Sequence, residues 1–424
     1  MGTMNKVRFE QSKIKFISDI YNGNSIPDDK KDLYINKKFP YVGTKDIDAE
    51  THQINYKNGL SVNEEDGFRI AKAGSSLLCI EGGSAGKKIA HLSQNVAFVN
   101  KLCCIDPANI DSKFLFYSLQ SCDFLSDFNL HLTGMIGGVK IGELKNLSIT
   151  CPNNFDEQNK IASLLDQKIS QIDSLVSNQE KQIWKLKEYR QALITKAVTK
   201  GLDPSVQMKD SGVESIGRVP SSWSVLKTKY VFDKLLKGSG ITKQDIFDDG
   251  DIQCVRYGEI YSKYDISFRK SYSRTIEKTI PSKVYLNYGD IVFSGTGELI
   301  EEIGKNIVYL GTEKCLAGGD IIVGKHHSNP SFLNYALYCS SSQIQKSKGK
   351  AKLKVVHISP TEIGNIFIAI PPLEEQAKIA LYLDEKLSTI NKLIELKQLK
   401  IVDLKNYKQS LIYEYVTGKK RVSL

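Results

Sequence analysis

The sequence contains two closely similar segments, and this internal repeat constrains the fold more than any other feature. DEQNKIASLLDQK, which starts at Asp156, aligns with EEQAKIALYLDEK, which starts at Glu374. The alignment continues without a gap for about 43 residues, a length that indicates one structural element present twice.

Apolar residues in both segments recur at alternating spacings of four and three residues, the heptad pattern of a coiled-coil seam. The seam residues are Leu165, Ile169, Ile172, Val176, Ile183, Leu186 and Leu193 in the first segment and Leu383, Leu387, Ile390, Ile394, Ile401, Leu404 and Leu411 in the second. The pattern predicts one long helix per segment. The alternative, an amphipathic helix lying on a globular core, usually has a wider apolar stripe and a shorter run.

Four seam positions are polar, namely Gln179, Arg190, Lys397 and Lys408. A parallel pair of helices in register would place Arg190 against Lys408, and burying two like charges is costly. The chain between the two segments must also leave the end of one helix and enter the start of the other. We therefore expect the helices to run antiparallel.

The region before each predicted helix lacks the heptad pattern and instead has short β-rich runs separated by Gly, Asn and Asp turns. The two regions share a weak skeleton: PYVGTKDI resembles IQCVRYGEI, AGSSLLCI resembles YGDIVFSG, and GKKIAHL resembles GKNIVYL. The sequence predicts an α+β fold in which two globular α/β domains alternate with two long helices in a pseudo-two-fold repeat. The predicted segments are a first domain (1–153), a first helix (154–200), a linker (201–222), a second domain (223–371), and a second helix with a C-terminal tail (372–424).

Two glycine-rich stretches invite a cofactor interpretation. EGGSAGKKIA, from Glu81, has the wrong glycine spacing for a phosphate loop, and Lys88 stands where that loop needs Ser or Thr. FSGTG, from Phe293, fits the Phe-x-Gly-x-Gly pattern of adenine methyltransferases but lacks the accompanying Asn/Asp-Pro-Pro-Tyr/Phe motif. The eight cysteines and six histidines show no metal-ligand spacing. We expect no catalytic, metal or cofactor site on this chain, with a standalone S-adenosylmethionine-dependent DNA methyltransferase as the alternative.

Composition limits the partners. No apolar run approaches the ~20 residues of a membrane span, and the N-terminus lacks the apolar core of a signal peptide. Together with the cysteine usage, this predicts a cytoplasmic protein without a membrane partner. The net charge of +10 is compatible with a polyanionic partner.

A helix of ~43 residues is about 65 Å long, close to two turns of B-DNA at about 34 Å per turn. Two unlike domains on such helices suit a split DNA sequence.

Over essentially its whole length the chain resembles the specificity subunits of Type I restriction-modification systems. The likeness lies in PLEEQAKIA, which ends at Ala380, and a degraded CPNNFDEQNKIA; in the helix endings EYRQALITKAVTKG and NYKQSLIYEYVTGK; and in the linker MKDSGVESIGRVPSSW. Departures from the family pattern are Asn153 after Pro152 and Ser215 where Trp is frequent.

The resemblance implies a non-catalytic subunit with two target-recognition domains, each reading one half of a bipartite double-stranded DNA target. Two modification subunits that use S-adenosylmethionine would dock on the helices and methylate adenine. Restriction subunits that use ATP and Mg would join them to cleave DNA. A third possibility is a coiled-coil scaffold with no role on DNA.

Base and phosphate contacts need Arg, Lys, Asn or Gln on exposed loops. The candidates in the first domain are Asn22, Asn24, Lys30, Lys31, Lys37, Lys38, Thr44, Lys45 and Lys87. Those in the second are Lys237, Ser239, Lys243, Arg256, Tyr257, Lys263, Arg269, Lys270 and Arg274. KSKGKAKLK adds Lys346, Lys348, Lys350, Lys352 and Lys354, which an extended segment would place on one side as a phosphate-tracking row or as a charged edge strand.

Overall fold

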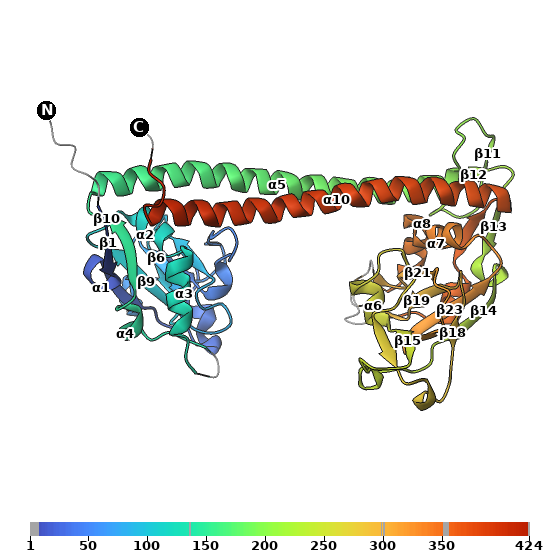
Figure 1. The fold of residues 1–424 in the computed structure, drawn as a ribbon, viewed down its shortest axis with the longest axis horizontal. Coiled ribbons are helices and arrows are strands. Elements are labelled where there is room, and N and C mark those ends of the chain that lie inside the picture. The colour runs from blue at the N-terminus through green and yellow to red at the C-terminus, as the bar shows by residue number, and fades with distance from the viewer. Residues whose placement is uncertain (1–7, 135–136, 298, 300–301, 351–355, 423–424) are drawn as a thin grey trace. The chain divides into compact units, whose positions relative to one another are not determined.

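The computed structural model describes residues 8–134, 137–297, 299, 302–350 and 356–422. The chain divides into two compact units, Met1–Lys181 with Lys397–Leu424 and Gln182–Leu396. Each unit combines one globular domain with part of both long helices, α5 (Phe155–Lys200) and α10 (Leu373–Val416) (Figure 1). Within the residues described, no helix carries an apolar stretch of the kind that spans a lipid bilayer.

Two four-stranded sheets form the first domain. One has the order β2 (Ser18–Asn22), β9 (Leu102–Pro107), β6 (Ser76–Cys79) and β7 (Ile89–His91), and the other β4 (Ser61–Val62), β3 (Phe39–Val42), β8 (Val96–Phe98) and β5 (Ile70–Ala71). The short helices are α1 (Ile14–Ile17), α2 (Ser112–Ser118), α3 (Cys122–Leu130) and α4 (Ile141–Leu144). β1 (Phe9–Lys13) pairs antiparallel with β10 (Ser148–Pro152), so both ends of the domain meet beside the start of α5.

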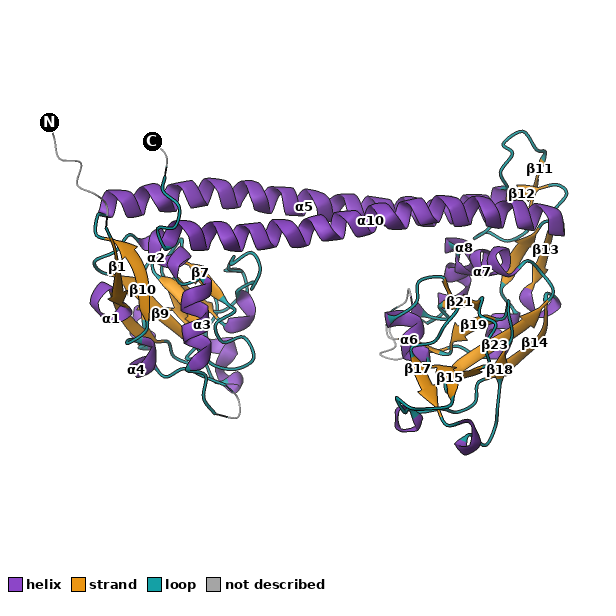
Figure 2. Cartoon of the chain, in the orientation of Figure 1, coloured by secondary structure: helices purple, strands orange, loops and turns teal. Residues whose placement is uncertain are grey.

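The second domain repeats this plan (Figure 2). One sheet has the order β14 (Phe232–Lys237), β23 (Ile321–His326), β19 (Ile291–Ser294), β21 (Asn306–Tyr309) and β16 (Ser267–Phe268). The other has β17 (Ser273–Thr275), β15 (Ile252–Val255), β22 (Cys315–Ala317) and β18 (Tyr285–Leu286). β13 (Ser224–Lys227) pairs with β25 (Phe367–Ile370), and β20 (Thr296–Gly297) pairs with β24 (Val356–His357). The helices are α6 (Tyr257–Ser262), α7 (Pro330–Tyr338), α8 (Ser340–Ser347) and α9 (Pro360–Gly364).

The shared sheet order confirms the weak sequence skeleton. β3 and β15 each pair parallel with the strand that follows the hairpin, β8 and β22 respectively. β6 and β19 are fully buried central strands, each followed by an antiparallel partner, β7 or β21. Buried strands of this kind tolerate many apolar sequences, which explains why the fold recurs with little identity between the domains.

The two long helices run antiparallel, as the sequence predicts. In the first unit, Leu165 and Ile169 of α5 share a buried core with Leu411 and Tyr415 of α10. The start of α5 therefore packs against the end of α10 (Figure 1). In the second unit the order is reversed, with Ile194 and Ala197 of α5 in one core with Ile379 and Leu383 of α10. The helices have 46 and 44 residues, slightly more than the repeat itself indicates.

A linker leads from the end of α5 into the second domain. Gly201 has a positive φ of 75° directly after α5, the left-handed conformation that often terminates helices. A short hairpin of β11 (Met208–Asp210) and β12 (Arg218–Pro220) follows. Trp223 is then buried, and its Nε1 donates a hydrogen bond of 3.0 Å to Glu375 Oε2 at the start of α10. The linker is thereby tied to the second helix.

Candidate DNA interface and the attachment of each domain to its helix

In the first domain, several predicted contact residues lie on exposed loops. Lys30 and Lys31 lie on the short 3-10 helix η1 (Asp28–Leu33), and Lys45 lies on η2 (Thr44–Asp46). Lys87 lies in the turn between β6 and β7 and is exposed, as are the other three. These lysines are therefore accessible to a phosphate backbone.

Several candidates in this domain, the exposed Lys31 among them, already have partners. Lys31, Lys37 and Lys38 pair with Asp28, Asp66 and Glu64 at 2.5, 2.9 and 2.8 Å. Asn24 Oδ1 accepts from the Arg69 backbone N–H at 2.9 Å, and the Thr44 carbonyl accepts from Lys88 Nζ at 2.7 Å. Asn22 is half-buried. These residues shape the loops as well as offering polar groups.

The second domain exposes Lys237, Lys243, Tyr257, Lys263, Arg269 and Lys270. Three other candidates make contacts within the domain. Ser239 is buried and its Oγ accepts from the Val284 backbone N–H at 2.8 Å, which corrects its prediction as a DNA contact. The Arg274 guanidinium donates hydrogen bonds to the Gly250 and Asp251 carbonyls, at 2.6 and 3.1 Å. Arg256 is half-buried and lies 3.5 Å from Glu259.

The prediction of one extended lysine row is wrong for its first half. Lys346 lies on α8, a helix, where it is buried, and Lys350 is a half-buried partner of Glu362 at 2.7 Å. Lys348 is exposed. Lys352 and Lys354 lie outside the described residues. α8 forms because Ser340–Ser347 packs on the domain, and this tertiary contact overrides the alternating pattern.

Buried Lys346 is a structural centre of the second domain. Its Nζ donates to the Gly304 carbonyl, Asn306 Oδ1 and the Leu337 carbonyl at 2.9, 2.7 and 2.8 Å. All three ammonium hydrogens are therefore used. Burial lowers the pKa of Lys346 to about 7.

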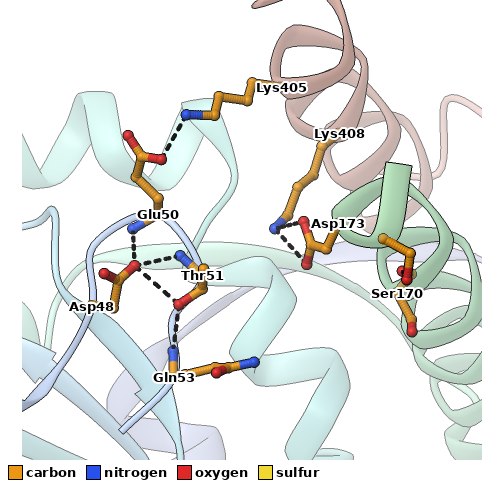
Figure 3. A network of polar contacts seen from close by, with 9 residues as sticks. Asp48, Glu50, Thr51, Gln53, Ser170, Asp173, Lys405 and Lys408 are labelled. Atoms are coloured by element: carbon orange, nitrogen blue, oxygen red, sulfur yellow. Dashed lines mark hydrogen bonds and ion pairs between the residues drawn. The ribbon is translucent and has the colours of Figure 1, made fainter. Parts of the chain in front are cut away.

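The polar seam residues of the helices have polar or oppositely charged partners (Figure 3). Lys408 Nζ donates to both carboxylate oxygens of Asp173, at 2.8 and 3.1 Å, and Lys405 pairs with Glu50 of the first domain at 2.6 Å. Lys397 donates to Gln179 at 3.4 Å. In the second unit, Arg190 pairs with Asp265, whose Oδ2 also accepts from Asn391 Nδ2 at 3.2 Å. The antiparallel arrangement thus gives Lys408 a carboxylate from the other helix, whereas Arg190 obtains its carboxylate from the second domain.

Each domain is attached to its own helix by a second set of contacts that the sequence analysis missed. In the first unit, Gln158 Oε1 on α5 accepts from the Asp111 backbone N–H at 2.8 Å, and Asp111 caps α2. Two turns further along α5, Asp166 Oδ1 accepts from Tyr117 Oη at 2.6 Å.

The second unit repeats both contacts. Gln376 Oε1 accepts from the Asn329 backbone N–H at 2.9 Å, and Asp384 Oδ1 accepts from Tyr335 Oη at 2.5 Å. Burial raises the pKa of both phenols, and the accepting carboxylates raise it further, so both remain donors. The four residues of the first unit lie 218 residues before their counterparts in the second unit, the same offset that relates the two helices. This constant offset was the signal for these contacts in the sequence.

The two glycine-rich stretches have packing roles. Gly86 has a positive φ of 72° and faces the ring of Phe128. A Cβ on Gly295, within FSGTG, would lie 2.8 Å from the Asp320 carbonyl oxygen. Only glycine fits such a close backbone approach. In the described part of the chain, no group of three or more His, Cys, Asp or Glu side chains could hold a metal ion.

Comparisons with known proteins agree with this architecture. The model of a family described as "Type I restriction modification DNA specificity domain" matches residues 6–184 and 220–404. The chain is 25% identical over 402 residues to the Type I restriction enzyme MjaVIII specificity subunit of Methanocaldococcus jannaschii, covering 91% of this chain and 86% of that protein. It is 31% identical over 189 residues to the putative type I restriction enzyme MjaX specificity subunit of the same organism, covering 42% and 44%.

Solved structures show the same fold. A chain from a structure on complex assembly and conformational transition of the type I R-M system has a TM-score of 0.72 at 15% identity, and the match covers 98% of this chain and 100% of that one. The HsdS subunit from Thermoanaerobacter tengcongensis has a TM-score of 0.50 at 16% identity, with 97% of each chain covered.

Proposed function

Because this chain belongs to the Type I restriction-modification DNA specificity family, we propose that its two domains read the two halves of one bipartite double-stranded DNA target. The repeated sheet order supports this proposal, because it gives two equivalent scaffolds that carry different exposed residues. The first scaffold exposes Lys30, Lys45 and Lys87, whereas the second exposes Lys237, Arg269 and Lys270. Exposed cations of this kind bind phosphates, and neighbouring polar groups read base edges.

We further propose that the long helices set the spacer between the two half-sites. Helices of 46 and 44 residues correspond to about 65 to 70 Å at 1.5 Å per residue. Antiparallel packing with matched charges, such as Lys408 with Asp173, resists sliding of one helix along the other. A rigid pair would fix the number of base pairs between the half-sites.

The helices also offer a surface for protein partners. α10 exposes Leu396, Leu399 and Val402, and α5 exposes Trp184 and Tyr189. Large apolar side chains on an exposed helix are typical of binding surfaces. We propose that two modification subunits dock there with S-adenosylmethionine and methylate adenine. Restriction subunits with ATP and Mg join the complex for cleavage, and the chain acts in the cytoplasm as a non-catalytic component.

We expect the chain to transfer no methyl group by itself and to direct methylation once its modification subunit is bound. The reason is that recognition and chemistry are placed on different subunits in this proposal. The measurement is incorporation of labelled methyl from S-adenosylmethionine into DNA, with the chain, the modification subunit and their complex tested in parallel. Methylation by the chain alone would instead support the standalone methyltransferase suggested by FSGTG.

A further inference from the structure

Within the first four turns of its own helix, each globular domain makes two polar contacts that recur in both units. The first point is a buried glutamine, Gln158 or Gln376, whose Nε2 also donates to the carbonyl of Pro152 or Pro371 at 2.9 Å. This glutamine joins the end of the domain, the start of the helix and the capping residue of α2 or α7. It holds the point where the chain enters the helix.

The second point is the tyrosine-aspartate hydrogen bond. Asp166 and Asp384 lie eight residues beyond Gln158 and Gln376, which places them about 12 Å further along the helix axis. Two polar contacts spaced along the axis, together with the shared apolar cores, define the direction of the domain on its helix. Tyr117 and Tyr335 lie on α2 and α7, so the hydrogen bond connects a rigid part of the domain to the helix.

A cavity adjoins each of these hydrogen bonds. In the first unit it has a volume of about 560 Å³ and is lined by Tyr117, Asp166, Ile169 and Asp173, among others. In the second unit it has about 470 Å³ and is lined by Tyr335, Asp384, Leu387 and Asn391, among others. The packing beside each hydrogen bond is therefore incomplete and leaves room for a small change of angle, although Ile172 of α5 and Leu387 of α10, further along the helices, remain in the shared cores.

We propose that Tyr117 and Tyr335, through Asp166 and Asp384, are positioning residues that set the angle of each recognition domain on its helix and thereby restrict the spacer length the complex accepts. The proposal rests on the function proposed above and adds the residues that control it. It concerns the spacing between the half-sites and not the bases read within them.

The expected size of the effect follows from the geometry. A water molecule inserted between Tyr335 and Asp384 would lengthen the contact by about 2.5 Å, since water-mediated bonds replace direct ones. Over a lever of about 12 Å, this allows a tilt of at most about 12°. At a distance of about 25 Å, close to the far side of a domain of this size, the tilt displaces the surface by about 5 Å. That displacement is one to two base pairs at about 3.4 Å each.

The test uses the Tyr335→Phe variant in the full chain, bound to its modification subunit. Methylation rates are measured on duplexes that keep both half-sites and vary the spacer from two base pairs shorter to two longer. We expect the methylation rate of the variant on the natural spacer to fall several-fold. The ratio of its rate on spacers that differ by one base pair to its rate on the natural spacer should rise about tenfold over the wild-type ratio. The sequences of both half-sites should stay unchanged.

Asp384→Asn is the matched control, because its amide oxygen still accepts from the tyrosine hydroxyl. It should keep the wild-type spacer profile. Tyr117→Phe repeats the test in the first unit, where Lys113 of α2 also pairs with Asp166 and should make the broadening smaller. The inference can then be judged even where one variant folds poorly. A wild-type profile in both phenylalanine variants, or an equal broadening in Asp384→Asn, would refute a positioning role for the hydrogen bond. Failure of the proposed function would appear differently, as no methylation of any split sequence by the wild-type complex.

Discussion

We expect that replacing residues 1–153 with the corresponding domain of a relative will change one half of the methylated sequence and leave the other half unchanged. The expectation follows from the separate cores of the two units: the first domain packs around Phe114 and Phe128, and the second around Phe293 and Leu333. Neither core contains side chains from the other globular domain. The measurement is a base-resolution map of methylated adenine in DNA modified by the chimeric complex.

The exchange should succeed when the donor domain keeps the attachment to α5. Its α2 must offer a backbone N–H to Gln158 and a tyrosine to Asp166, as Asp111 and Tyr117 do. The reciprocal exchange of residues 223–371 is the control and should change only the other half. Simultaneous change of both halves in either chimera would contradict independent recognition by the two domains.

The Lys346→Met variant should lose about 3 kcal/mol of unfolding free energy at pH 9, because a buried acceptor left without a donor costs about 1 to 3 kcal/mol. Methionine fills the space of lysine but removes the donor shared by the Gly304 and Leu337 carbonyls and Asn306 Oδ1, two of which the neutral amine can serve at pH 9. Both tryptophans, Trp184 and Trp223, belong to the second unit, so their fluorescence in urea reports its unfolding. Lys348→Met, two residues away on the surface, is the control and should be nearly neutral.

The effect of Lys346→Met should also depend on pH. Burial lowers the folded-state pKa of Lys346 from 10.5 to about 7, so between these values the unfolded chain binds one more proton than the folded chain. Wild-type stability therefore rises with pH through this window, by up to about 1.4 kcal/mol per pH unit. The variant lacks the group, so the difference between the two proteins should shrink as pH falls from 9 towards 7. A difference that stays constant with pH would show that Lys346 keeps its charge in the folded state.

The long helices could be predicted from the sequence because their signal is local and repeated. The heptad spacing from Leu165 to Leu193 and from Leu383 to Leu411 specifies a seam, and the cations at Arg190 and Lys408 exclude a parallel pair. The acids that satisfy those cations, Asp265 and Asp173, were not predicted. Their contact depends on how loops and helices meet, which no local spacing encodes.

The candidate interface was harder to predict than the fold. Alternating lysines suggested an extended segment at KSKGK, but Lys346 lies on a helix and donates into the core. Ser239 and Arg274 also have the residue type of a DNA contact, yet their side chains bond the backbone of their own domain. Residue type and loop context give the chemistry a side chain offers, whereas its direction is decided by tertiary packing.

The tyrosine-aspartate contacts, in contrast, are long-range contacts that leave a signal in the sequence. The signal is seen when the two copies of the repeat are compared residue by residue. Tyr117 and Asp166 are 49 residues apart, and so are Tyr335 and Asp384. Outside the long helices the two copies are too divergent for a continuous alignment to extend that far. A shorter match at the same offset of 218 residues joins Phe114, Leu115 and Tyr117 of α2 to Phe332, Leu333 and Tyr335 of α7.

The central claim is that two recognition domains on one chain read a split DNA target. It is tested most directly by letting the chain, bound to its modification subunit, methylate a library of random DNA sequences and by reading every methylated site. The account predicts methylated adenines only in sequences with two fixed segments separated by a constant number of unspecified base pairs. Methylation of one uninterrupted sequence, or of two segments at freely varying separation, would contradict it.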